Sequence, residues 1–194
     1  MLKNSAKSFC YDGAMKLIIV NGLPATGKTL LSSQLSKSLD IPKIGKDDIK
    51  EFLFDKLGVR DREWSRSLGM ASNDILYQLT DTLLSRDESL IVENAFEYQF
   101  AKPKFEKLID KYNPEVYEIY CLTDKDVRRK RFVDRNESGE RHVGHNDVFN
   151  YVSEDEAEPQ EKYDILQVGQ LIKVDTTDFS TVFIESIVRS LNQV

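Results

Sequence analysis

Residues 22–29 read Gly-Leu-Pro-Ala-Thr-Gly-Lys-Thr, and this stretch decides the fold that we expect for the whole chain. It fits the phosphate-binding P-loop pattern of Gly, any four residues, Gly, Lys and then Ser or Thr. The glycines allow a tight turn that brings backbone N–H groups within reach of phosphate oxygens. In such a loop Lys28 contacts the β- and γ-phosphates, and Thr29 offers its hydroxyl to Mg²⁺. The residues expected to contact the phosphates are Gly22, Leu23, Pro24, Ala25, Thr26, Gly27, Lys28, Thr29 and Leu30.

The flanking sequence supplies the strand–loop–helix setting that a P-loop requires. Residues 16–21 are a largely apolar run of strand length, and residues 29–39 carry leucines at helical spacing. The N-terminus of that helix adds a positive dipole end that favours an anion. The alternative is an ordinary glycine-rich turn between a strand and a helix, without a ligand.

Length and composition indicate one globular domain. The chain has 194 residues, of which 40% are hydrophobic and 31% charged. Its net charge of −6 argues against a general nucleic-acid coat protein, although a local basic groove is compatible with it. No apolar run approaches the ~20 residues of a membrane span. Cys10 and Cys121 form neither a disulfide framework nor a metal pattern, which favours the reducing cytoplasm.

Residues 1–14 are polar and lack the apolar segment of a secretory signal. We expect them to be a disordered leader. We expect residues 15–194 to form a single P-loop domain, with a lid around 125–147.

Five expected strands alternate with helices, which indicates an α/β fold. The strands are expected at 17–21, 43–45, 90–93, 116–122 and 171–174. Their near-continuous apolar runs are typical of a parallel sheet that helices cover on both faces. Asp47 is the expected N-cap of the second helix, Gly58 its end, and Asn113 the end of the fourth. The expected helices are 28–39, 47–57, 63–86, 100–112, 124–136, 146–153 and 180–192.

Other motifs choose among the proteins that use P-loops. A GTPase needs an Asn-Lys-x-Asp guanine-binding motif, and a transporter ATPase needs a Leu-Ser-Gly-Gly-type signature; the sequence contains neither. The chain is also short for a ring-forming ATPase with its additional lid domain. A small phosphotransferase remains.

Asp47 is the candidate catalytic base. Transfer of a phosphoryl group to an alcohol needs a carboxylate near the attacking hydroxyl. Asp47 follows the second expected strand, and sites in such sheets lie beyond the carboxyl ends of the strands. Lys50, one helical turn later, shares its face and is a candidate for holding substrate or the migrating phosphoryl group. The alternative is that Asp47 only caps the helix and that Lys50 is a surface charge.

Residues 125–141 are a candidate lid. They contain seven basic and four acidic residues, and Arg128, Arg131 and Arg135 fall on one helical face. Small kinases use such lids to bring guanidinium groups over the phosphates, where these groups stabilise the transition state. The alternative is a solvated basic helix.

Further candidates follow the lid and the third strand. Arg141, His142 and His145 lie beside the lid arginines and are either substrate contacts or structural residues; two histidines are too few for a metal site. Glu93 ends the third strand and can hold Mg²⁺, directly or through water, or orient the attacking group. Asn94 and Phe96 would then line the substrate cleft. Residues 59–80, with Trp64, Met70 and Tyr77, either form a wall of this cleft or pack as an ordinary helix.

On these residues, the sequence resembles a family of small P-loop kinases, the AAA-type kinases grouped with polynucleotide 5′-kinase, chloramphenicol phosphotransferase and zeta toxin. The resemblance runs over most of residues 16–192. It implies a three-layer P-loop NTPase fold of the kinase type, with a five-stranded parallel sheet in the order 2-3-1-4-5. It also implies ATP and Mg²⁺ as cofactors. In the family the first Asp after the second strand is the general base, which maps to Asp47, and the lid arginines map to Arg131 and Arg135.

The sequence departs from its relatives at three positions. Lys50 replaces the Arg of polynucleotide kinases and cannot make the same bidentate phosphate contact. Glu93 replaces an Asp of many relatives, and Val143 a Pro. We therefore expect an ATP-dependent kinase that phosphorylates a hydroxyl of a small molecule, with Lys28, Asp47, Arg131 and Arg135 as catalytic residues. Two alternatives stay open: a polynucleotide 5′-hydroxyl kinase, and a module that binds and hydrolyses ATP without transfer.

Overall fold

The computed structural model describes residues 14–139, 141–145 and 160–192. The five strands form one parallel sheet in the order β2-β3-β1-β4-β5, as the resemblance implied. The strands are β1 (Lys16–Asn21), β2 (Lys43–Gly45), β3 (Leu90–Glu93), β4 (Glu115–Leu122) and β5 (Gln170–Asp175). The helices are α1 (Lys28–Leu39), α2 (Lys46–Leu57), α3 (Arg62–Leu84), α4 (Tyr98–Tyr112), α5 (Lys125–Glu137) and α6 (Ile184–Leu191). Short 3₁₀ turns are η1 (Val143–His145), η3 (Gln160–Tyr163) and η4 (Phe179–Thr181).

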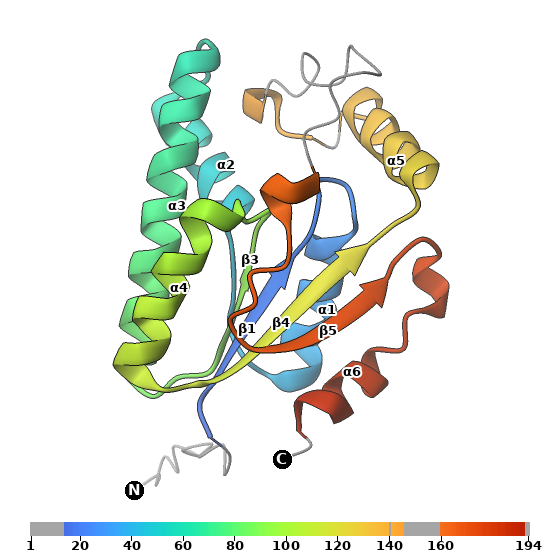
Figure 1. Cartoon of the computed structure of the whole chain (residues 1–194). Coiled ribbons are helices and arrows are strands. Elements are labelled where there is room, and N and C mark those ends of the chain that lie inside the picture. The colour runs from blue at the N-terminus through green and yellow to red at the C-terminus, as the bar shows by residue number, and fades with distance from the viewer. Residues whose placement is uncertain (1–13, 140, 146–159, 193–194) are drawn as a thin grey trace, which may run out of the picture.

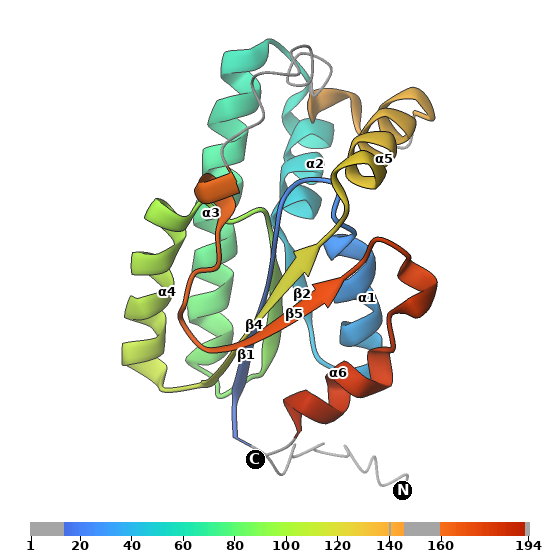
Figure 2. The same ribbon diagram turned by 45° about the vertical axis from the view of Figure 1, so that its right-hand side comes forward.

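The alternation of side chains along β1 explains why helices cover both faces of the sheet in three layers. Successive side chains of a strand point to opposite faces. Ile18 and Val20 therefore pack into one core with α1 and α6, whereas Leu17 and Ile19 pack into the other with α3 and α4. Figures 1 and 2 show these two pairs of helices on opposite sides of the sheet. Because both faces are covered, every residue of β1 is buried, as the apolar run predicted.

Most expected elements are confirmed, with corrections at some ends. Gly58 ends α2 with a φ of 83°, and Asn113 ends α4 with a φ of 51°. The helix expected at 180–192 is two elements, because the Asp178 side chain accepts a hydrogen bond from the Ser180 N–H and closes the η4 turn before α6 starts. The helix expected at 146–153 and leader residues 1–13 lie outside the described residues.

The prediction that Asp47 caps α2 is wrong. The helix begins one residue earlier, at Lys46, because Gly45 ends β2 in an extended conformation and is itself the N-cap. Gly45 also lies close to the first turn of α2, since a Cβ atom there would be 2.5 Å from a carboxylate oxygen of Asp48. Asp47 therefore lies inside the first turn, and its carboxylate is not used for capping.

The carboxyl edge of the sheet is where the site residues gather. In Figure 1 the strands point toward this edge; α2 and the N-terminal part of α3 rise beyond it on one side, and α5 on the other. The loop that joins β1 to α1 lies between them. No helix within the described ranges is long and apolar enough to cross a membrane.

Candidate active site

The P-loop has the backbone that its glycines predict. Gly22, Ala25 and Gly27 have φ values of 135°, 63° and 79°. A Cβ atom at Gly22 would lie 2.6 Å from the carbonyl oxygen of Cys121 in β4. Only glycine fits this conformation at such close approach, so the loop can leave β1 and turn directly into α1.

Lys28 folds back over the loop that it follows. Its Nζ atom donates a hydrogen bond to the carbonyl oxygen of Leu23 at 2.7 Å, and the Thr26 hydroxyl donates to the same oxygen at 2.8 Å. Burial lowers the pKa of Lys28, and the charge of Glu93 opposes this effect. A buried ammonium group at the N-terminus of a helix is well placed to bind an anion.

The side-chain oxygens of Thr29 and Glu93 lie next to each other at the carboxyl edge. The Thr29 hydroxyl donates a hydrogen bond to Oε2 of Glu93 at 3.2 Å. Burial raises the pKa of Glu93, and the charge of Lys28 opposes the rise. Mg²⁺ in phosphate sites takes one or two protein oxygens and completes its shell with phosphate and water. The pair fits such an ion, and no group of three or more metal-binding side chains competes with it in the part of the chain that the structure describes.

Asp47 lies across the carboxyl edge from the P-loop. Its Oδ1 accepts a hydrogen bond from Nζ of Lys46 at 3.1 Å, and its Oδ2 accepts one from Nη1 of Arg141 at 3.0 Å. Burial would raise the pKa of Asp47, but the charges of Lys46 and Arg141 outweigh it and hold the pKa well below its usual range. The side chain is still 41% exposed, so the ionised carboxylate remains accessible.

The negative charge of Asp47 affects the pKa values of Lys28 and Glu93. It opposes the lowering of the Lys28 pKa and contributes to the raised pKa of Glu93. The structure therefore brings together Lys28 from α1, Glu93 from β3 and Asp47 from α2. The charges of Glu93 and Asp47 both favour the protonated form of Lys28.

Lys50 does not line the opening as its shared face with Asp47 suggested. It is only 7% exposed, and its Nζ atom donates a hydrogen bond to the Ser65 hydroxyl in α3 at 3.0 Å. It also lies over the Phe54 ring, 5.3 Å from its centre. Because α3 packs directly on α2, Lys50 is enclosed between the two helices, a contact that the sequence pattern of α2 alone could not reveal.

The segment 141–145 docks on α2. His142 stacks on Phe54 with ring centres 5.3 Å apart and an angle of 8° between the planes. Nε2 of His145 lies 2.9 Å from Oε1 of Glu51. Burial lowers the pKa of His145 to about 3, although the charge of Asp47 favours the protonated form. Both histidines therefore hold the segment on α2, and Arg141 is the member of this segment that reaches Asp47.

The two lid arginines have different positions. Nη2 of Arg131 donates to the carbonyl oxygens of Thr176 and Thr177 at 2.7 and 3.0 Å. Arg131 thus fastens α5 to the loop after β5. The guanidinium of Arg135 lies 5.7 Å from the centre of the Phe132 ring, and its charge contributes to the lowered pKa of Lys28. Of these two arginines, Arg135 is the one whose charge affects the pKa of Lys28.

The two candidates after β3 are placed differently from each other. Asn94 donates from its side-chain amide to Oδ1 of Asn73 in α3 at 3.0 Å, at the carboxyl edge. Phe96 is 1% exposed and packs edge-on against Phe105 with ring centres 5.1 Å apart. The expectation that Phe96 lines the cleft is therefore wrong, because its ring fills the core between the sheet and α4.

Two contacts of the site were not anticipated. Lys46 is the closest cation to Asp47 in sequence and pairs with it. The Thr176 hydroxyl, directly after β5, donates to the backbone oxygen of Thr26 at 2.6 Å and so supports the P-loop from the side. The signal for Thr176 was present, since a residue that follows a parallel strand lies at the carboxyl edge.

The sequence profile of the AAA domain family matches residues 17–152. The chain belongs to the AAA domain family. A candidate kinase from Chloroflexus aurantiacus shares 33% sequence identity with it, over 93% of this chain and 98% of that one, with a TM-score of 0.81. The resemblance of this AAA domain to small P-loop kinases is thereby confirmed.

More distant structures show the same fold. A sugar kinase from Janibacter sp. HTCC2649 has 14% identity and a TM-score of 0.53, over 93% of this chain and 94% of that one. The APS kinase CysC from Mycobacterium tuberculosis, solved with AMPPNP and APS, has 14% identity and a TM-score of 0.56, over 93% and 99%. A comparison with curated proteins gave no match.

Proposed function

We propose that this AAA domain is an ATP- and Mg²⁺-dependent kinase that transfers the γ-phosphate to a hydroxyl group of a small molecule. The observation that carries the proposal is the exposed carboxylate of Asp47, which follows β2 at the carboxyl edge and is held in place by hydrogen bonds from Lys46 and Arg141. A nucleotide-binding loop alone needs no ionised carboxylate on the facing helix. A phosphotransferase needs one near the hydroxyl that attacks.

The donor side of the site would bind ATP. The P-loop amides and Lys28 would hold the β- and γ-phosphates, and Thr29 and Glu93 would hold Mg²⁺. Bound Mg²⁺ would neutralise charge that develops on the phosphate oxygens. Arg135 would add positive charge from the lid, as its influence on Lys28 suggests.

The acceptor side would be organised by Asp47. Each oxygen of its carboxylate accepts one hydrogen bond, from Lys46 or from Arg141, and keeps lone-pair capacity for an acceptor hydroxyl. The hydroxyl oxygen would form a bond to the γ-phosphorus while the bond to the β–γ bridging oxygen breaks. Asp47 would take the hydroxyl proton, and ADP would leave.

The low pKa of Asp47 is compatible with this role. A carboxylate with a lowered pKa is a weak base, yet it remains ionised at all pH values near neutrality. The transition state of phosphoryl transfer is loose, so that positioning of the hydroxyl matters more than early removal of its proton. Lys46 and Arg141 fix the orientation of the carboxylate before the acceptor binds.

The test is acceptor-dependent release of ADP. The purified protein is incubated with ATP and Mg²⁺ and a panel of hydroxyl compounds, and products are measured by mass spectrometry. The proposal predicts that at least one compound accelerates ADP release and gains one phosphoryl group. Equal ADP release with and without every compound would instead support the alternative of an ATP-hydrolysing module. Transfer confined to oligonucleotide 5′-hydroxyls would support the polynucleotide kinase alternative.

A further inference from the structure

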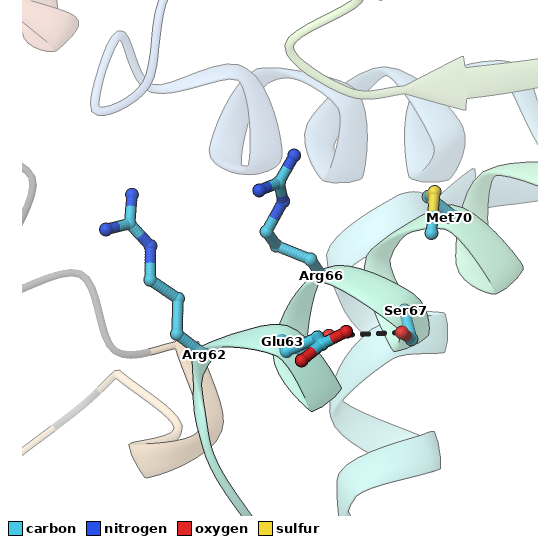
Figure 3. A pocket seen from close by; sticks show the side chains of 5 residues that line it. All are labelled: Arg62, Glu63, Arg66, Ser67 and Met70. Carbon is cyan, nitrogen blue, oxygen red and sulfur yellow. Dashed lines mark hydrogen bonds between the residues drawn. The ribbon is translucent and has the colours of Figure 1, made fainter.

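A hollow on the N-terminal part of α3 has no part in the mechanism above. Figure 3 shows its wall, which Arg62, Glu63, Arg66, Ser67 and Met70 form. Its volume is about 600 Å³. Ligand sites for small molecules span roughly 300–1,000 Å³, so the hollow is large enough for a metabolite.

Two arginines dominate the chemistry of this hollow. Arg62 and Arg66 are one helical turn apart, and in Figure 3 both guanidinium groups extend to the same side of α3. Both are exposed, and neither has an ion pair or hydrogen bond to another described residue. Like charges at this spacing repel each other slightly, so the arrangement does not serve the stability of the helix.

The other lining residues leave these two cations available. The Ser67 hydroxyl donates to the backbone oxygen of Glu63 within the helix. The Glu63 carboxylate makes no ion pair with either arginine among the residues that the structure describes. Met70 is 64% exposed and offers an apolar surface at the end of the hollow. The wall thus carries two guanidinium groups, one carboxylate and the apolar side chain of Met70.

The hollow adjoins the acceptor side of the site. Gly69, one helical turn after Arg66 on the same face, lies against Lys50, since a Cβ atom there would be 3.8 Å from Nζ of Lys50. Lys50 lies one helical turn after Asp47 on α2. Further along α3, Asn73 bonds Asn94, which directly follows Glu93. This face of α3 therefore runs beside the base and ends at β3.

The donor phosphates have their own cations elsewhere. Lys28 belongs to the P-loop after the central strand β1, and Arg135 belongs to α5, which follows β4. The hollow lies on the N-terminal part of α3, which packs on α2, and neither Lys28 nor Arg135 lines it. Arg62 and Arg66 are therefore placed for a second anion, separate from the triphosphate.

We propose that the acceptor carries an anionic group, a carboxylate or a phosphate, besides the hydroxyl that is phosphorylated, and that Arg62 and Arg66 bind this group. The planar guanidinium fork matches the oxygen spacing of both anions. Met70 would contact the carbon skeleton of the acceptor. This inference rests on the proposed kinase function, because it names the acceptor class of that site.

The experiment measures binding separately from catalysis. Two matched series serve as probes: glycerol, glycerate and glycerol 3-phosphate, and glucose, gluconate and glucose 6-phosphate. Within each series the hydroxyl groups are similar and the charged group changes. Each compound is titrated by calorimetry into the protein with ADP and Mg²⁺. We expect an anionic member of at least one series to bind at least about tenfold more tightly than its neutral partner. The carboxylate and phosphate arms identify which anion is preferred.

Variants locate the binding to the two arginines. Arg62→Ala and Arg66→Ala should each weaken binding of the preferred anion by about tenfold or more, as expected for lost charged hydrogen bonds, and should leave the affinity for ADP unchanged. Arg66→Lys should restore only part of the loss, because lysine lacks the planar fork. Arg86→Ala is the matched control, since Arg86 is an exposed arginine just after the far end of α3. It should bind the anion as the unaltered protein does.

The outcomes separate this inference from the kinase proposal. The inference is overturned if no anionic compound binds more tightly than its neutral partner, or if the arginine variants bind the anion unchanged. Phosphoryl transfer to a neutral polyol without dependence on Arg62 or Arg66 would support the proposed kinase function and contradict the inference of an anionic acceptor. Arginine-dependent binding of an anion without any transfer would keep the anion site and reject the kinase.

Discussion

Nη1 of Arg141 donates a hydrogen bond to Oδ2 of Asp47 at 3.0 Å, and the two residues lie 94 positions apart in the sequence. The pair joins the segment after α5 to the first turn of α2. It lowers the pKa of Asp47, together with Lys46, and fixes the orientation of its carboxylate. The docking of residues 141–145 is therefore part of the construction of the site.

Gly144 should be indispensable for this docking. A Cβ atom there would lie 2.4 Å from the Phe54 ring, which is fully buried. We expect Gly144→Ala to push the segment from α2 and to destabilise the fold by about 1–3 kcal/mol, as overpacking does. Chemical denaturation measures this change.

Gly69→Ala is the control for that variant. A Cβ atom at Gly69 would lie 3.8 Å from Lys50, an ordinary contact, and alanine favours a helix by about 1 kcal/mol over glycine. We expect this variant to be as stable as the unaltered protein or more so. Similar losses for both variants would contradict the close packing of Gly144.

His145 should make stability depend on pH. Its pKa is about 3 in the folded protein because burial disfavours the charged form, whereas the pKa of an unburied histidine is 6.5. The unfolded chain therefore binds more protons between these values, and stability is complete above pH 6.5 and falls as the pH decreases below it. The expected loss between pH 7 and pH 5 is roughly 1–2 kcal/mol.

The His145→Gln variant tests this origin. Glutamine retains a polar group but does not titrate, so the slope of stability against pH between 5 and 6.5 should flatten. Denaturation curves at several pH values measure it. An unchanged slope in the variant would assign the dependence to other groups.

Arg131 should stabilise the position of α5 more than it assists the chemistry. Its two hydrogen bonds to the carbonyl oxygens of Thr176 and Thr177 join α5 to the loop after β5. We expect Arg131→Ala to lower the free energy of unfolding by about 1–2 kcal/mol, since hydrogen bonds from charged donors are among the stronger ones. Lys130→Ala, on the exposed face of the same helix, should cost less than about 0.5 kcal/mol. Equal effects of the two changes on the free energy of unfolding would contradict a stabilising role of the Arg131 hydrogen bonds.

The sequence predicted the sheet and the donor side because both depend on local patterns. The apolar runs of β1, β3 and β4 and the glycines of the P-loop dictate strands and a turn wherever they occur. The placement of Asp47 beyond β2 followed from the same topology. The prediction that Asp47 caps the helix was wrong, because Gly45 is the N-cap and α2 begins at Lys46.

The remaining differences arise from packing between elements distant in sequence. The enclosure of Lys50 depends on Ser65, fifteen residues away on another helix. The position of Arg131 depends on the loop after β5, and that of Phe96 on Phe105 in α4. Helical spacing gives the face on which a side chain lies, but it does not tell which element covers that face.

The central claim is that Asp47 serves the acceptor hydroxyl, and the most direct measurement compares Asp47→Asn with Asp48→Asn. Both changes remove one negative charge from the first turn of α2, but Asp48 pairs with Lys43 outside the site. We predict that Asp47→Asn lowers the rate of phosphoryl transfer at least about 100-fold while its affinity for ATP is nearly unchanged, and that Asp48→Asn retains the rate. Phosphoryl transfer by Asp47→Asn at the rate of Asp48→Asn would contradict the role of Asp47 at the acceptor hydroxyl.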